Sequence, residues 1–239
     1  MPETSVTDSS GDAGPSATES NAAGASPDGR LSRAARTRAA VVDALLTLNE
    51  QGNVRPTARD IAAEAGVSLR SLYVHFDDLE ALFVAAGHRQ AERLGKVLPP
   101  MVTKGSLPER LDAFMTRRVR IHEFGAGVRR AALLQEPFSP VLQQALRNAR
   151  QALRAEVEVC FGPELAAAAG PARRERLLVA LDVATSPATW ESLRTHQDLP
   201  VDEAAAHVRA MVLAFLHAWV PADAVGDTPA SATRPATGP

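Results

Sequence analysis

The stretch that decides the fold runs over residues 58–77 and reads ARDIAAEAGVSLRSLYVHFD. Two short segments of helix-forming residues flank Gly66, which can take the left-handed backbone conformation that a sharp turn between helices requires. The apolar and small residues at the spacing of a compact core are Ile61, Ala62, Val67 and Leu72. This pattern predicts a helix-turn-helix, in which the second helix stands out from the molecule as a rod.

The residues around this stretch set the ends of its helices. Thr57 and Asp60 have the spacing of a capping box, with Asp in place of the usual Glu, and Ser68 can cap the second helix. A longer helix is expected over residues 33–51, because Val41 and apolar residues four and seven positions later share one face. Gly52 is a plausible end for it.

The rest of the chain also favours helices over strands. Aromatic residues make up only 4% of the sequence, whereas strands are usually rich in aromatic and β-branched residues. Further helices are expected over residues 78–98, 107–124, 127–135, 138–161, 171–196 and 201–219. Pro187 should kink or open the helix that contains it. The predicted fold class is all-α, with an N-terminal three-helix helix-turn-helix domain and a C-terminal helical domain for ligand binding and dimerisation.

The composition changes at both ends of the chain. Residues 1–30 and 222–239 are rich in small residues and proline, and residues 1–29 carry five acids and no base. Such segments lack the apolar side chains that offset the entropy of ordering, so both tails are expected to be disordered. The intervening chain is predicted to divide into a DNA-binding domain at 34–94, with its motif at 57–76, and a second domain at 95–221.

Composition and charge also bear on the compartment and the partners. The single cysteine excludes an intrachain disulfide framework, and no apolar run or signal peptide points to a membrane or to secretion. We therefore expect a cytoplasmic protein. The formal net charge is −2, but residues 30–75 carry seven arginines against four acids. A basic block of this kind, beside a helix-turn-helix, favours double-stranded DNA as a partner.

At this point a family resemblance is clear. The run TARDIAAEAGVSLRSLYVHFDDLEALF, together with the preceding helix, resembles the DNA-binding domain of the tetracycline-repressor (TetR) family over about residues 34–94. The resemblance implies an all-α homodimeric transcription regulator, usually a repressor. In that family a small-molecule effector binds the C-terminal domain and releases the protein from its operator DNA.

Residues at the family's DNA-contacting positions follow from the same alignment. Thr57 matches a residue that caps the second helix and bonds a phosphate, and Arg59 matches one that reaches a base edge. Ordinary chemistry agrees, because arginine can bond guanine as a fork, whereas hydroxyl and imidazole groups donate to phosphates. The expected DNA-binding residues are Arg36, Thr57, Arg59, Ser68, Leu69, Arg70, Ser71, Tyr73 and His75.

Three positions qualify this assignment. The family commonly has lysine where this chain has Leu79, which puts one phosphate contact in doubt. The family also often has an aromatic residue where this chain has Asn53. Arginines of the first helix are available to compensate. Leu69 has two interpretations of equal weight: it meets a thymine methyl group in the groove, or it belongs partly to the core on the face of Leu72 and Phe76.

The C-terminal domain has an apolar middle and two apolar final helices. The resemblance places the effector pocket among its helices, and the candidates there are Phe114, Arg118, Ile121, His122, Phe138 and Trp190. The final helices carry stripes too apolar to leave in solvent, which indicates a dimer interface. Its candidate residues are Leu181, Ala184, Val208, Met211, Phe215 and Trp219.

Other chemistry finds little support in the sequence. His122 and Glu123 resemble the start of a zinc-protease helix, but Ala126 stands where the second histidine is needed. No metal, cofactor or catalytic triad is expected, and the protein is predicted not to be an enzyme. The competing interpretation is a helical protein that binds a small molecule or another protein and does not bind DNA.

Overall fold

The computed structural model describes residues 27–221, and its regular elements there are all helices. The two tails that were predicted to be disordered lie outside these residues, except that residues 27–30 form the start of the first helix. The α-helices are α1 (Pro27–Glu50), α2 (Ala58–Glu64), α3 (Leu69–His75), α4 (Leu79–Val97), α5 (Leu107–Gln135), α6 (Pro140–Cys160), α7 (Gly162–Ala167), α8 (Pro171–Ala184), α9 (Pro187–Glu191) and α10 (Val201–Trp219). A 3₁₀ turn, η1 (Glu136–Phe138), precedes α6, and a π-helical turn, η2 (Ser192–His196), follows α9. The all-α prediction is confirmed.

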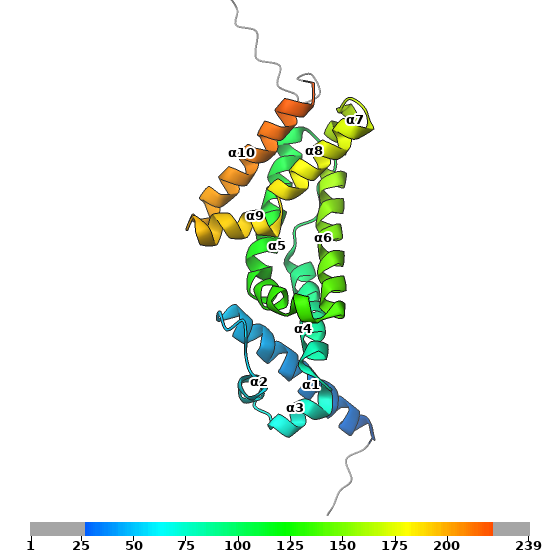
Figure 1. The fold of residues 1–239 in the computed structure, drawn as a ribbon. Coiled ribbons are helices and arrows are strands. Elements are labelled where there is room, and N and C mark those ends of the chain that lie inside the picture. The colour runs from blue at the N-terminus through cyan, green and yellow to red at the C-terminus, as the bar shows by residue number, and fades with distance from the viewer. Residues whose placement is uncertain (1–26, 222–239) are drawn as a thin grey trace, which may run out of the picture.

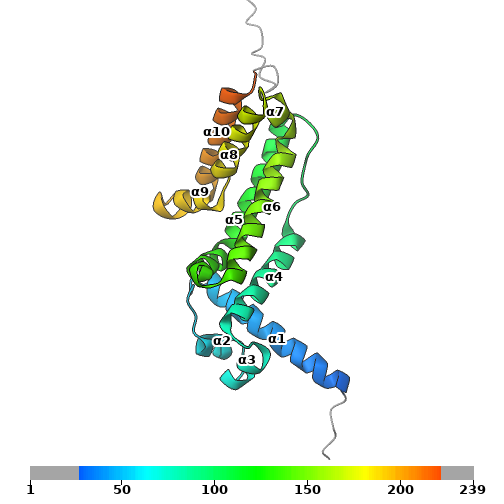
Figure 2. The same ribbon diagram turned by 45° about the vertical axis from the view of Figure 1, so that its right-hand side comes forward.

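The molecule is elongated, with α1, α2 and α3 at one end and α7, α8 and α10 toward the other (Figure 1). Helix α4 leads from the first group to the second, and α5 and α6 run side by side in both views (Figure 2). The N-terminal group has its own core, whose fully buried members include Val41, Leu45, Ile61, Leu72 and Leu82. The predicted core positions of the helix-turn-helix are therefore confirmed.

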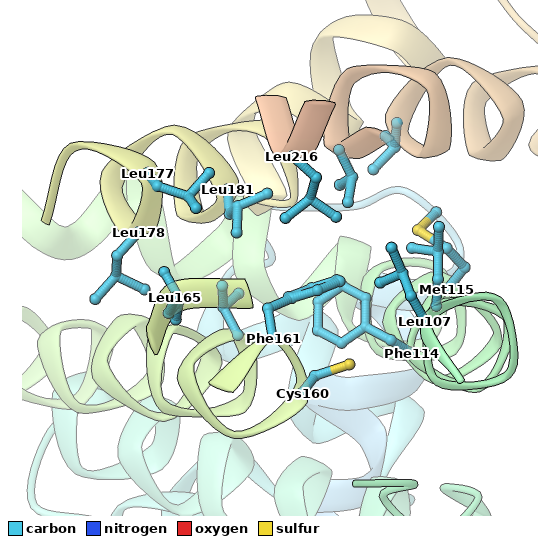
Figure 3. Close-up of a cluster of buried hydrophobic side chains, with 14 of the residues drawn as sticks. Leu107, Phe114, Met115, Cys160, Phe161, Leu165, Leu177, Leu178, Leu181 and Leu216 are labelled. Carbon is cyan, nitrogen blue, oxygen red and sulfur yellow. The ribbon is translucent and has the colours of Figure 1, made fainter. Parts of the chain in front are cut away.

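A second core fills the C-terminal domain (Figure 3). The Phe114 ring of α5 meets the Phe161 ring at the end of α6 edge to face, with 5.2 Å between centroids. Leucines from α8 and α10 close over these rings, including Leu177, Leu181 and Leu216. Each core draws on helices distant in sequence, so each domain is held by its own apolar cluster.

Helix α5 differs from the prediction of two helices separated by a break at residues 125–126. It is continuous over 29 residues, because glycine lowers helix stability without ending a helix that is packed on both sides. Pro187 behaves as predicted, since the long helix expected over 171–196 divides into α8, α9 and η2 around it.

Gly127 has a specific reason to be glycine. A Cβ atom at this position would lie 2.4 Å from the backbone oxygen of Asn49, at the end of α1, whereas a Cβ atom on Gly125 would meet nothing within 4 Å. The absent side chain thus lets α5 of the C-terminal domain approach α1 of the N-terminal domain. Close by, the Gln90 amide of α4 donates to the Phe124 backbone oxygen of α5 over 2.7 Å.

This close approach leads to a prediction with an internal control. Gly127→Ala should lower the free energy of unfolding by about 1–3 kcal/mol, because backbone atoms cannot move aside as a flexible side chain would. Gly125→Ala should raise it by up to about 1 kcal/mol, since alanine has the higher helix propensity. Urea denaturation of both variants at one protein concentration measures the difference. Equal effects would show that α5 does not depend on contact with α1.

Candidate functional site

The helix-turn-helix is held by caps at both of its helices. The Thr57 backbone N–H and hydroxyl each donate to the Asp60 carboxylate over 2.8 Å, and the Asp60 N–H donates to the Thr57 hydroxyl oxygen over 3.2 Å. These bonds, the backbone one first, lower the pKa of Asp60. Ser68 caps α3 by accepting from the Ser71 N–H over 3.1 Å. The predicted capping box and second cap are confirmed.

The turn between α2 and α3 depends on Gly66. Its φ of 66° lies in the left-handed region, which favours glycine, as the sequence predicted. The Val67 N–H then donates back to the Ala62 backbone oxygen over 2.9 Å. Leu72 and Phe76 anchor α3 in the core at 0% and 2% exposure. As a result, α3 is fixed in orientation with one side buried and the other in solvent.

The outward side of α3 carries a mixed polar and apolar surface. Arg70 is exposed, and Tyr73 is 49% exposed. Leu69 is 37% exposed and lies outside the N-terminal core, so its position supports the groove interpretation over the core interpretation. Ser71 and His75 are half-buried at the flanks of this surface.

The sequence interpretation missed Val74, which is 72% exposed on the same side. A valine this exposed in the last turn of α3 is suited to apolar contact with a thymine methyl group. The signal was available, because Val74 lies four positions after Arg70 and therefore shares its helix face.

Exposed arginines surround this surface. Arg36 of α1, Arg59 of α2 and Arg70 of α3 form no ion pair with any acid of the described residues. Arg38 instead stacks on Phe76, with its guanidinium carbon 4.6 Å from the ring centroid. Arg36, Arg59 and Arg70 thus present guanidinium groups without ion pairs around the exposed face of α3, where they are available to contact a phosphate backbone.

Four of the six residues predicted for an effector pocket come together inside the C-terminal domain. Phe114, Arg118, His122 and Trp190 are each at most 5% exposed. The Arg118 guanidinium carbon lies 4.7 Å from the Phe114 ring centroid, and its Nη2 donates to the Leu153 backbone oxygen over 2.9 Å. The His122 and Trp190 rings pack with centroids 5.7 Å apart. Ile121 is half-buried beside them.

Burial controls the protonation of this cluster. It lowers the pKa of Arg118 to about 10, and burial together with the Arg118 charge lowers the pKa of His122 to about 3. His122 is therefore neutral near pH 7, and its Nε2–H donates to the Thr185 backbone oxygen over 3.0 Å. Arg118 keeps its charge but has a buried Nε without a hydrogen-bond partner within the described structure. Burial also raises the pKa of the Cys160 thiol to about 11, which favours packing over reactivity.

Phe138 does not join this cluster, contrary to the prediction. Helix α5 ends at Gln135, and the tight turn η1 that follows turns the Phe138 ring outward, where it is 81% exposed. It lies instead beside Leu79 and Phe83 of α4, around a separate cavity.

The predicted dimer interface also needs correction. Leu181, Ala184 and Val208 are at most 3% exposed, because they fill the contact of α8 and α10 with the chain's own core. A different face of α8 is open: Val179 and Val183, one helical turn apart, are 45% and 59% exposed. With half-buried Phe215 and Trp219 of α10 they line a hollow of about 430 Å³. Met211 is also half-buried.

Comparison with known proteins agrees with this geometry. Residues 42–86 match the family described as bacterial regulatory proteins of the tetR family. A comparison with curated proteins finds no match. The fold is similar to that of a transcriptional regulator from Rhodococcus sp., with 18% identity, a TM-score of 0.59, and 79% of this chain and 99% of that chain covered.

Two further solved structures share the fold. A putative TetR-family transcriptional regulator from Mesorhizobium loti has 19% identity and a TM-score of 0.58, with 79% of this chain and 99% of that chain covered. A tetR-family transcriptional regulator from Streptomyces coelicolor has 20% identity and a TM-score of 0.57, with 76% and 82% covered. Over residues 42–86 the chain thus matches the DNA-binding part of the TetR family, as the sequence resemblance predicted, and over the rest of the described residues it shares the fold of these solved structures.

No helix within residues 27–221 is long and apolar enough to cross a membrane. These residues also contain no group of three or more His, Cys, Asp or Glu side chains able to hold a metal ion.

Proposed function

We propose that the protein is a homodimeric repressor that binds operator DNA through α3 and leaves it when a small molecule binds the C-terminal domain. The observation that carries the proposal is the outward face of α3, where Leu69, Arg70, Tyr73 and Val74 are all exposed. Arg36 and Arg59 flank this face without acidic partners. The proposal includes no catalytic activity, and it places the regulator in the cytoplasm with the DNA.

The contacts with DNA divide by chemistry. Arg59 and Arg70 have free guanidinium groups that can read guanine edges as a fork. Arg36, Tyr73 and His75, with the hydroxyls of Ser68 and Ser71, are assigned to the DNA backbone, where donors fix the register without reading sequence. Leu69 and Val74 are assigned to apolar contacts in the groove. The hydroxyl of Thr57 is already engaged with Asp60, so we assign Thr57 mainly to holding the motif in place.

The dimer is proposed to form through the open face of α8 and the adjoining face of α10. Val179 and Val183 are strongly exposed apolar side chains, and such patches on a soluble protein mark interaction sites. A two-fold pair of chains would read two half-sites on successive turns of the duplex. The proposed interface is therefore the α8/α10 hollow, which includes Phe215 and Trp219 of α10, and half-buried Met211 lies one helical turn before Phe215.

Regulation requires that the C-terminal domain be coupled to α3. Helix α4 joins the two domains, and its Gln90 bonds to α5. The Arg93 guanidinium of α4 also pairs with Glu50 of α1 over 3.2 Å. A ligand that favours a different position of α5 would move α1 and α4, and would thus change the separation of the two recognition helices.

The DNA assignment yields a prediction in which two variants behave differently. Arg59→Ala should weaken binding to the preferred operator by about 1–3 kcal/mol and relax the preference at one base pair. Tyr73→Phe should weaken binding to all duplexes more evenly, because it removes a phosphate donor. The measurement is fluorescence anisotropy on an operator selected from random duplexes, and on single-base variants of it.

Arg120→Ala is the matched control, because Arg120 is exposed on α5 and its loss makes the same change in charge. It should leave the operator affinity nearly unchanged. Equal affinity of wild type and Arg59→Ala would refute the base contact. Binding of the wild type to DNA should weaken steeply as the salt concentration rises. If the wild type shows no such DNA binding, the proposed function is wrong, and the alternative of a ligand-binding protein without DNA binding takes its place.

A further inference from the structure

A cavity of about 370 Å³ lies where the DNA-binding domain meets the C-terminal domain. One wall comes from the segment before α2 and from the start of α4, and the other from the end of α5, η1 and the start of α6. In both ribbon views the start of α6 lies close to α4 (Figures 1 and 2). The lining residues that matter for the argument are Arg55, Leu79, Glu80, Phe83, Phe138 and Ser139.

The apolar part of this cavity has no occupant within the chain. Phe138 is 81% exposed, although an aromatic ring of this size is normally covered by protein. Leu79 and Phe83 of α4 face the same space and are only half-buried. Leu79 stands where the family commonly has a lysine, so the substitution removes a positive charge from this spot and adds an apolar wall to the cavity.

The two charged side chains that line the cavity differ in their partners, because Glu80 is hydrogen-bonded within the chain and Arg55 has no ion pair. The Glu80 carboxylate accepts a hydrogen bond from the Ser139 hydroxyl, and Ser139 in turn caps α6 by accepting from the Leu142 N–H over 3.0 Å. Arg55 is exposed, and its guanidinium group has no ion pair with any acid of the described residues. The Arg55 guanidinium is therefore the cationic group at the edge of the cavity that has no ion-pair partner, whereas the Glu80 carboxylate has one oxygen bonded to Ser139.

We infer that this interdomain cavity binds a small amphipathic acid, with its apolar body between Leu79, Phe83 and Phe138 and its anionic group on Arg55. The volume lies at the lower end of the range for small-molecule sites, which suits a single ring system or a short alkyl chain. The apolar body of such a ligand would cover the exposed Phe138 ring, and its anionic group would pair with the Arg55 guanidinium. The site is distinct from the buried cluster around Arg118 and His122.

The position of the cavity gives the ligand a regulatory role, and this part rests on the proposed function. The Glu80–Ser139 bond crosses from α4 to α6, and the cavity walls belong to both domains. The shape of the cavity therefore depends on how the domains sit on each other. A ligand that fits one arrangement better than another shifts the balance between them, and with it the position of α3.

The first experiment uses two probes of matched shape. Anilinonaphthalene sulfonate is apolar and anionic, and N-phenyl-1-naphthylamine is its neutral counterpart; both fluoresce more strongly in apolar sites. We expect saturable binding of the anionic probe at one site per chain. Phe138→Ser should weaken both probes about 10-fold or more. Arg55→Gln should weaken the anionic probe about 10-fold and leave the neutral probe unchanged.

Two controls separate this cavity from other surfaces. Val159→Ser removes another exposed apolar side chain, from α6, and Arg120→Gln removes another exposed cation, from α5, so neither should change either affinity. If Phe138→Ser leaves both affinities unchanged, the probes bind elsewhere, for example on the α8/α10 hollow, and the site is refuted. If Arg55→Gln weakens both probes alike, the anionic preference is refuted.

The second experiment tests the regulatory role with operator DNA present. The affinity of the anionic probe should differ at least about fivefold between free protein and the protein–operator complex. Phe138→Ser should bind operator like the wild type, and it should lose this difference. Equal probe affinity in both states refutes the coupling and leaves the cavity as a ligand site. A protein that binds no operator refutes the proposed function, whereas the probe titrations of the free protein still decide on the cavity.

Discussion

Val183→Glu is expected to convert the protein to a monomer and to lower its affinity for operator DNA about 100-fold or more. Val183 is 59% exposed in the single chain, so a carboxylate is harmless there until two chains meet. In the proposed α8/α10 interface the same carboxylate would be buried without a partner, which costs several kcal/mol. A monomer then has one recognition helix in place of two, and it loses the gain from binding two half-sites.

Val159→Glu provides the matched control, because Val159 is 53% exposed on α6 and lies away from the α8/α10 hollow. Light scattering at micromolar concentration and operator titration measure both variants. The control should remain a dimer and keep its operator affinity. A dimeric Val183→Glu variant that binds operator like the wild type would refute this interface, and a monomeric wild type would refute the dimer itself.

Arg110→Ala should cost about 3–5 kcal/mol of stability, because it breaks a buried ion pair. Arg110 of α5 and Glu164 of α7 are 3% and 2% exposed, and Arg110 Nη1 donates to Glu164 Oε2 over 3.1 Å. The hydrogen bond with Glu164 raises the pKa of Arg110. Arg110 also donates to the Cys160 backbone oxygen at the end of α6. Its removal leaves the buried Glu164 carboxylate without a cation, and it removes the hydrogen bonds that connect α5 to α6 and α7.

Arg209→Ala controls for the loss of an arginine in an ion pair. Arg209 pairs with Asp112 on the surface, where screening by water reduces the contribution to about 1 kcal/mol or less. Urea denaturation at a fixed protein concentration compares the variants. The double variant Arg110→Met with Glu164→Leu should recover most of the loss, because it leaves no buried charge. A loss below about 1 kcal/mol for Arg110→Ala would show that the pair is open to solvent.

The N-terminal domain could be predicted in detail because its signals are local. The Thr57 and Ser68 caps, the Gly66 turn and the apolar spacing around Leu72 each act within a few residues. Short-range hydrogen bonds and helix periodicity follow directly from the order of residues, and the family match covers this same region. What the sequence did not show in this domain is how exposed individual residues of α3 are, as with Val74.

The C-terminal domain shows where such reasoning stops. The stripes on α8 and α10 were visible in the sequence, but an apolar stripe looks the same whether it meets its own core or another chain. Only tertiary packing decided that Leu181 and Val208 are internal and that Val179 and Val183 are open. Phe138 likewise lies outside the expected pocket, because α5 ends at Gln135 and Phe138 belongs to the 3₁₀ turn that follows, where its side chain is exposed.

By itself the sequence determined the all-α class, the helix-turn-helix and the identity of the residues on its exposed helix, because caps, turns and helical period are properties of neighbouring residues. The tertiary structure alone decided which apolar residues remain uncovered, how closely α5 approaches α1 at Gly127, and that Arg55, Leu79 and Phe138 share one cavity. These features join segments 24 to 83 residues apart in the chain, and their contacts depend on how whole helices pack, which no local pattern records.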